Sequence, residues 1–138
     1  LEVDTDFNVN VITGSDGVIS QASGGHSDTA AGSKISIILA PLIRSRLPIV
    51  VDKVTTVVTP GETVDVLVTD YGIAVNPLRT DLIGNFKEAN LPLYTINELK
   101  DMAEKLTGKP DPIEFNDKIV GVVEYRDGTV IDVIRQPK

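Results

Sequence analysis

The residues whose types are best suited to ligand binding or catalysis lie in one stretch of small and hydrogen-bonding side chains at residues 23–34. Gly24 and Gly25 would let a ligand approach the backbone, and their successive amides can form an anion-binding nest. A short helix that begins near Ser27 or Asp28 would add its positive end, so a carboxylate or a phosphate would suit this site. The alternative is a purely structural turn in which Ser27 or Asp28 caps the helix.

His26 follows the two glycines and is the sole histidine of the chain, which also has no cysteine. These counts exclude a metal site with two histidine ligands, a thiolate nucleophile and a cysteine-ligated zinc or iron–sulfur site. Ser27 and Asp28 come directly after His26, but adjacent loop residues rarely point at one another, so we do not interpret the three as a hydrolase triad. The stretch also matches neither a P-loop nor a dinucleotide-binding fingerprint. A hydrogen bond from His26 to its own turn is the alternative to a role in binding.

A second group of candidates is cationic. Arg44 and Arg46 lie close in sequence to Lys34 and Lys53, so an anionic substrate could be drawn there, whereas an ordinary solvated loop is the alternative. The chain as a whole is acidic, with 13 Lys and Arg against 20 Asp and Glu and a formal net charge of −7. Such a surface repels polyanions, and no apolar run approaches the ~18 residues of a membrane span. We therefore expect neither nucleic acid nor membrane as a partner.

Strands are expected to form most of the core, because Val, Ile and Thr together supply 44 of the 138 residues. Strand-like segments separated by turn residues occur at 7–12, 18–20, 35–40, 48–51, 54–58, 64–69 and 72–75. The segment at 35–40 is almost continuously apolar, which predicts a central strand covered on both faces.

Helical patterns occupy two later segments. Thr95 and Glu98 have the spacing of a capping box, and the apolar periodicity that follows predicts a helix over about 96–107. A weaker pattern predicts a helix over 78–89, although Gly84 interrupts its middle.

The C-terminal segments at 118–125 and 129–135 predict a β-hairpin, because Asp-Gly between them suits a tight turn with positive φ. We divide the chain into an α/β unit at residues 1–108 and a connector with its hairpin at 109–138. The first residue is Leu1 and the one methionine is Met102, so we expect the chain to be a fragment.

Several long runs of the sequence closely resemble the citrate lyase alpha subunit family, whose members are citrate CoA-transferases. The runs lie at residues 6–11, 23–32, 51–56, 59–69, 72–77, 106–113 and 125–128. The resemblance implies a CoA-transferase-like α/β fold, an open mixed sheet with flanking helices, of which this chain would be the C-terminal portion. The N-terminal portion would be missing.

The resemblance also implies an activity. Citrate would replace acetate on an acetylated acyl carrier protein, giving a citryl thioester. The thioester belongs to a CoA-derived prosthetic group on that partner, so no cofactor is expected to bind this chain tightly. Related CoA-transferases use a glutamate nucleophile, but the citrate lyase branch is understood to exchange acyl groups without an enzyme-bound intermediate. The implied partners are the beta (citryl lyase) and gamma (acyl carrier protein) subunits, in a cytoplasmic oligomer.

We hypothesise that Gly24, Gly25 and Ser27 position a carboxylate or the developing oxyanion, that His26 donates a hydrogen bond, and that Asp28 supports the loop. No residue stands out as a catalytic nucleophile, and no metal is expected. Two other functions remain open: a non-catalytic binding or assembly module, or an acyl-CoA transferase for a different small carboxylic acid. The isolated fragment is expected to be inactive, and to self-associate if its sheet has lost partner strands.

Overall fold

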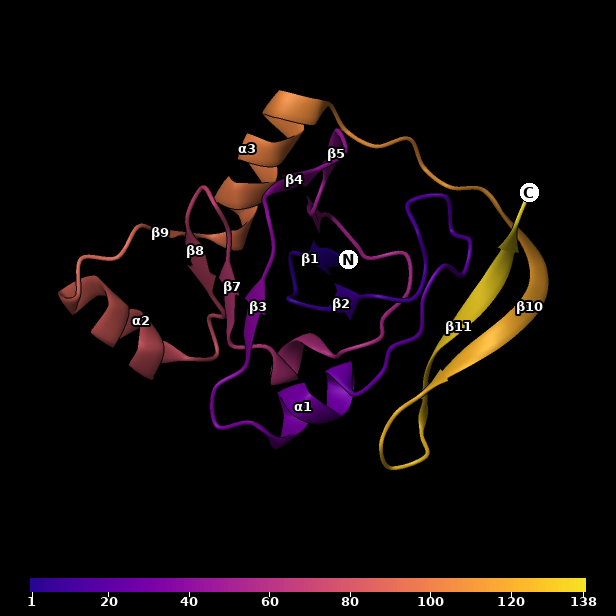
Figure 1. The fold of residues 1–138 in the computed structure, drawn as a ribbon, viewed down its shortest axis with the longest axis horizontal. Helices are drawn as coiled ribbons and strands as arrows, with labels where there is room; N and C mark the ends of the chain where they lie inside the picture. Colours follow the sequence, from indigo (N-terminus) through magenta and orange to yellow (C-terminus); the bar gives the residue numbers. More distant parts are fainter.

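Four small β-sheets and three α-helices make up the computed structural model, which describes residues 1–138 (Figure 1). The helices are α1 (His26–Gly32), α2 (Thr80–Glu88) and α3 (Ile96–Thr107), with a 3₁₀ helix η1 at Gly61–Thr63. The strands are β1 (Glu2–Asp4), β2 (Val9–Asn10), β3 (Ile37–Leu39), β4 (Ile43–Arg44), β5 (Leu47–Pro48), β6 (Val50–Val51), β7 (Val66–Val68), β8 (Ile73–Val75), β9 (Leu93–Tyr94), β10 (Phe115–Glu124) and β11 (Val130–Pro137). No helix is long and apolar enough to cross a lipid bilayer.

The largest sheet has the strand order β3-β7-β8-β9 and is mixed. β3 and β7 run parallel, β7 and β8 antiparallel, and β8 and β9 parallel. A second sheet, β2-β1-β6, also contains one antiparallel and one parallel pair. The expected open mixed sheet with helices beside it is therefore present, in the form of several small sheets.

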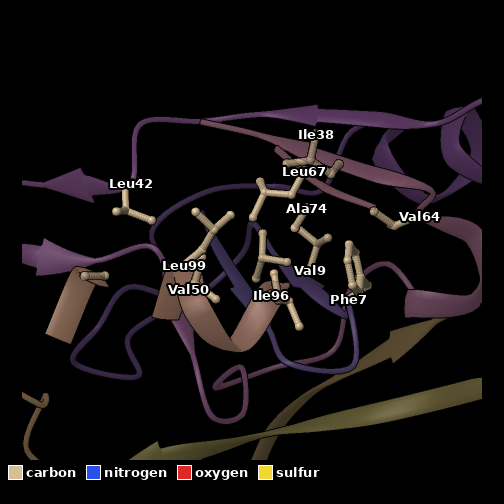
Figure 2. Packing of buried hydrophobic residues seen from close by; sticks show 12 residues of the cluster. Phe7, Val9, Ile38, Leu42, Val50, Val64, Leu67, Ala74, Ile96 and Leu99 are labelled. Atoms are coloured by element: carbon tan, nitrogen blue, oxygen red, sulfur yellow. The ribbon is translucent and has the colours of Figure 1, made fainter. Parts of the chain in front are cut away.

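The hydrophobic core lies between these two sheets and α3. Figure 2 shows Leu99 and Ile96 of α3 directed toward Val50 and Val9 of the smaller sheet and toward Leu67 of the larger one. Leu99 and Leu67 have no solvent-exposed surface. Complete burial of a leucine side chain contributes on the order of 2 kcal/mol, so Leu99 is a main contribution of α3 to this core.

The helix predictions are confirmed. α3 begins and ends at the predicted residues, and both halves of its capping box form: Glu98 N donates to Thr95 Oγ1 at 3.2 Å, and Thr95 N donates to Glu98 Oε2 at 2.7 Å. The Thr95 amide and hydroxyl hold the pKa of Glu98 below its usual value. α2 forms within the weaker predicted segment despite Gly84, around the buried Leu82.

The prediction that segment 35–40 is a central strand covered on both faces is wrong. β3 lies at the edge of its sheet, with β7 as its one neighbour. Ile38 faces the core and is 7% exposed, whereas Ile37 and Leu39 on the opposite face are 55% and 78% exposed. Continuous apolar sequence indicates that both faces need a cover, but the residues of this chain supply only one.

The predicted strand at 7–12 is reduced to β2, because a polar turn precedes it. Phe7 has a positive φ of 64°, and the Asp4 carboxylate accepts hydrogen bonds from the amides of Asp6 at 3.0 Å and Asn8 at 2.9 Å. This turn reverses the chain, so that β2 pairs antiparallel with β1. The predicted strand at 18–20 is also wrong as a strand, since that segment forms one isolated bridge, between Thr13 and Ile19.

Of the other predicted strands, 64–69 and 72–75 are confirmed as β7 and β8, and 48–51 contains the last residue of β5 and the whole of β6. Segment 54–58 is irregular, because most of its amides bind side chains, and only Val58 N donates to a strand residue, Val9 O at 3.0 Å. Val57 N donates to Asp132 Oδ2 at 2.7 Å, and Thr55 N donates to Glu2 Oε2 at 3.2 Å. The first of these bonds also attaches the C-terminal hairpin to the body of the molecule.

The C-terminal hairpin is confirmed as β10 and β11, which pair antiparallel as a separate sheet. Gly128 has a φ of +87° and donates its amide to Tyr125 O at 2.9 Å, so glycine supplies the positive φ of the turn. The hairpin lies beside the body at the end of the long connector that follows α3 (Figure 1). The division into domains at 1–108 and 109–138 stays a prediction.

Candidate functional site

The glycine-rich stretch forms a bend that leads into α1. Gly24 has a φ of +55°, which favours glycine, and Gly25 is the N-cap residue with an ordinary φ of −91°. The bend is held by two backbone hydrogen bonds, from His26 N to Ser23 O at 3.2 Å and from Thr29 N to Gly25 O at 2.8 Å. The predicted short helix is therefore confirmed, but it begins at His26.

The bend leaves four backbone amides without a partner inside the chain. Those of Gly24, Gly25, Ser27 and Asp28 donate to no protein atom, and neither Ser27 nor Asp28 caps the helix through its side chain. The alternative reading of these two residues as N-caps is therefore wrong. Gly24, Gly25 and Asp28 are exposed, so their amides can donate to water or to a bound acceptor.

His26 is held by a residue far away in the sequence. Its Nδ1 lies 2.7 Å from Oγ1 of Thr59, whose side chain is completely buried and whose amide and carbonyl both bond to Val9. Partial burial of the imidazole lowers the pKa of His26 from 6.5, so the ring is neutral at neutral pH. The alternative in which His26 bonds to its own turn is wrong for Nδ1.

A polar scaffold beneath the bend fixes Thr59 in place. Asn8 Oδ1 accepts from Gly61 N at 2.9 Å, and Asn76 Nδ2 donates to Gly61 O at 2.9 Å and to Val64 O at 2.8 Å. A Cβ on Gly61 would lie 1.9 Å from Asp6 O, so no other residue fits there. Sequence reasoning missed Asn8, Asn76 and Thr59, for which the Pro60-Gly61 and Asn76-Pro77 turns were the available signals.

Asp28 connects α1 to the C-terminal hairpin. Its Oδ1 lies 3.9 Å from Nε of Arg126, in the turn between β10 and β11. Both side chains are about half exposed or more, at 64% and 48%, so this ion pair contributes little to stability. It does place the hairpin turn next to the bend.

The four cations identified from the sequence do not form one site. Arg44 and Lys53 line a groove of about 700 Å³ between the body and the connector, where the carboxylates of Glu2, Glu104 and Asp111 also lie. Lys34 lines a separate recess of about 250 Å³. Because the groove carries charges of both signs, it does not have the electrostatics of an anion site.

Asp52 accounts for how the connector is held at this groove. Its two carboxylate oxygens accept from Lys100 Nζ at 2.6 Å and Lys109 Nζ at 2.5 Å. These hydrogen bonds, the one from Lys100 first, lower the pKa of Asp52 to about 2. Sequence reasoning missed this bridge. No three acidic or histidine side chains gather where they could hold a metal ion.

The fold and the bend together define an α/β protein with an exposed loop whose amides and neutral imidazole suit a small ligand bearing a carboxylate or phosphate. The family model "Citrate lyase, alpha subunit (CitF)" matches residues 1–137, so the chain belongs to the citrate lyase alpha subunit family.

Similar proteins agree with this assignment. The citrate lyase alpha chains of Klebsiella pneumoniae and Haemophilus influenzae are 68% and 60% identical over all 138 residues, which are 27% and 28% of their respective lengths. A crystal structure of the alpha subunit of citrate lyase from Streptococcus mutans, in complex with citrate, matches the whole chain with a TM-score of 0.97 and 59% identity, over 27% of its own length. The chain thus spans about a quarter of the length of these relatives.

Proposed function

We propose that this chain is part of a citrate CoA-transferase: the citrate lyase alpha subunit, of CoA-transferase-like fold, that exchanges acetate for citrate on an acetylated acyl carrier protein. The observation that carries this proposal is the family match over residues 1–137, with 68% identity to a citrate lyase alpha chain. The citrate bound to the Streptococcus mutans relative supports a carboxylic acid as substrate.

Within this function, the bend at residues 24–28 would hold a citrate carboxylate or the carbonyl oxygen that becomes negative when the thioester is attacked. Its unpaired amides are fixed hydrogen-bond donors, and such donors stabilise developing charge without reorganising during the reaction. Ser27 adds a hydroxyl at the first turn of α1, and Asp28 lies beside Arg126 of the hairpin turn. The proposal gives none of these residues the role of nucleophile. In direct exchange a citrate carboxylate attacks the acetyl thioester and the thiolate leaves; the thiolate then attacks the citryl carbonyl of the mixed anhydride, and acetate leaves.

The contact with Thr59 gives His26 a defined role in this proposal. The Thr59 hydroxyl is buried and has no other hydrogen-bond partner, so it would leave its own hydrogen unpaired if it accepted from Nδ1–H. It therefore donates to Nδ1, which places the proton of the neutral ring on Nε2. His26 would then act as a hydrogen-bond donor to the ligand through Nε2–H, and Thr59 would be the positioning residue that fixes this tautomer.

The partners in this function are the beta (citryl lyase) and gamma (acyl carrier protein) subunits of a cytoplasmic complex. The thioester substrate, on its CoA-derived group, would arrive on the gamma subunit. Because the chain spans 27% of its relatives, the remaining part of the subunit would supply the other walls of the site.

Activity of the complete subunit tests this function. The assay mixes it with acetylated acyl carrier protein and citrate and follows citryl thioester by mass spectrometry, with a panel of other small carboxylic acids in parallel. His26→Ala is expected to lower turnover at least ~10-fold, as the loss of a positioned donor does. Gln21→Ala, an exposed residue ahead of the bend, is the matched control and should leave turnover unchanged. Preference for another acid, or unchanged turnover in His26→Ala, would contradict the proposal.

The tautomer can be measured independently of activity. His26 is the sole histidine of the 138 residues, so ¹⁵N-histidine labelling gives signals from one imidazole. We expect the Nε2–H tautomer and a titration midpoint below 6.5. Thr59→Val should mix the two tautomers, whereas Thr59→Ser, which keeps the hydroxyl, should not. An Nδ1–H tautomer in the unmodified chain would disprove the donor role of His26.

A further inference from the structure

The outer face of β3 is the most exposed apolar surface within the larger sheet. Ile35, Ile37 and Leu39 alternate with core-facing residues and therefore lie on one side of the strand. They are 43%, 55% and 78% exposed. We call these three side chains the β3 outer face.

This face continues across the sheet as apolar surface. Leu39 is in register with Val68, which is in register with Ile73, and Ile37 is in register with Val66. Val66 is completely buried and Val68 and Ile73 are partly buried, so exposure is concentrated at β3. The β3 outer face is thus the most exposed end of a surface whose other residues are buried or partly buried.

The backbone of β3 is also open on its outer side. β7 is its one neighbour, reached through hydrogen bonds such as Val66 N to Ser36 O and Ala40 N to Val68 O, both 3.1 Å. In a parallel pair alternate residues point their amides and carbonyls away from the partner, which here applies to Ile37 and Leu39. No charged residue or proline protects the edge between residues 35 and 40.

We propose that the β3 outer face and the open edge of β3 are covered by the part of the citrate lyase alpha subunit that lies outside these 138 residues. That part is nearly three quarters of the polypeptide in the relatives, since this chain is 27% of their length. Parallel strands are normally covered on both faces. Covalent attachment makes the docking of this part intramolecular, which favours it over a second copy or another subunit. The proposal rests on the family match and not on the proposed activity.

Cysteine labelling tests this proposal in the complete subunit and in the 138-residue chain. The chain has no cysteine, so Leu39→Cys introduces a single thiol in this region; other cysteines of the subunit are replaced beforehand. The matched control is Lys105→Cys, at an exposed position of α3. In the complete monomeric subunit Leu39→Cys should react with maleimide at least ~10-fold more slowly than Lys105→Cys. In the 138-residue chain, diluted until it is monomeric, the two should react at similar rates.

Each other outcome overturns the proposal. Equal labelling in the complete monomeric subunit would show that the β3 outer face stays open. Protection that appears only as subunits dimerise would assign the face to a second copy, and protection that appears only in the assembled complex would assign it to another subunit. Ile37→Cys provides a second variant on the same face if Leu39→Cys does not yield folded complete subunit.

Discussion

Two helices of this protein, α3 and α1, differ in how the backbone amides of their first turns are hydrogen-bonded. α3 has 12 residues, buries Ile96, Leu99 and Ala103, and begins with a complete capping box. α1 has 7 residues, buries Ala30 alone, and has Gly25 as its N-cap, with no side-chain hydrogen bond to its first turn. The first turn of α3 satisfies its own amides, whereas the first turn of α1 leaves amides available to another molecule.

The difference separates a helix that stabilises the fold from one whose first-turn amides stay unpaired within the chain. A helix whose first-turn amides are bonded by its own side chains can be recognised from local sequence, and most of its stability comes from packing in the core. A short helix with open amides gains little stability from itself and depends on the residues beneath it. In this chain those residues are Thr59 and the Asn8–Gly61–Asn76 scaffold.

The largest expected effect tests whether α3 carries the stability. Leu99→Ala should lower the free energy of unfolding by about 2–5 kcal/mol, because it opens a cavity between the two sheets. The measurement is chemical denaturation of the 138-residue chain. Leu106→Ala, on the same helix but 58% exposed, should change it by less than about 0.5 kcal/mol. Similar losses in the two variants would contradict the role of α3 in the core.

An intermediate effect tests the capping box. Thr95→Ala removes the acceptor for Glu98 N and should destabilise the chain by about 1 kcal/mol. Since the pKa of Glu98 is lowered in the folded state, its contribution is present above the ordinary carboxyl pKa and is lost as the pH falls through its folded value. Denaturation midpoints near neutral pH and in acid check both points. Asn97→Ala, at the second residue of α3, is the control. A loss of stability in Asn97→Ala as large as that in Thr95→Ala would refute the role of the capping box.

The smallest expected effect concerns α1 and has the opposite sign. Gly25→Ser should stabilise the chain by a few tenths of a kcal/mol, because a serine hydroxyl can accept from the Ser27 or Asp28 amide. A Cβ at Gly25 meets Thr29 Oγ1 at 3.7 Å, which is an ordinary contact. The same change should reduce citrate exchange by the complete subunit, since it consumes a donor. Gly24→Ser, at a φ of +55°, should instead destabilise. Unchanged exchange in a stabilised Gly25→Ser would show that the free amides have no role.

Prediction from the sequence was most accurate where the pattern is local. The capping box and apolar spacing gave both ends of α3, and the Asp-Gly turn gave the C-terminal hairpin. Prediction was least accurate where an acidic side chain accepted hydrogen bonds from backbone amides. The Asp4 turn delayed the start of the predicted strand at 7–12, and Glu2 and Asp132 took the place of a strand partner for Thr55 and Val57.

For the candidate site, the sequence located the segment but not the long-range hydrogen bonds that hold it. It selected residues 24–28 because glycines and small polar residues recur there, and the structure shows their amides to be open. It gave no sign of the contact between His26 and Thr59, which are 33 residues apart. It also grouped four cations, of which Arg44 and Lys53 line one recess, Lys34 lines another and Arg46 lines neither.

By itself the sequence therefore determined the family, the helix α3, the hairpin and the position of the bend. The signal for the family is long runs of similarity, and the signal for each of the others lies in residues within a few positions of one another. The tertiary structure alone decided that β3 is an edge strand, that Thr59 holds His26, and that Asp52 binds Lys100 and Lys109. The physical reason is sequence separation, because local hydrogen bonds join residues three or four positions apart. Burial and long-range pairing depend on which distant segments the whole chain brings together.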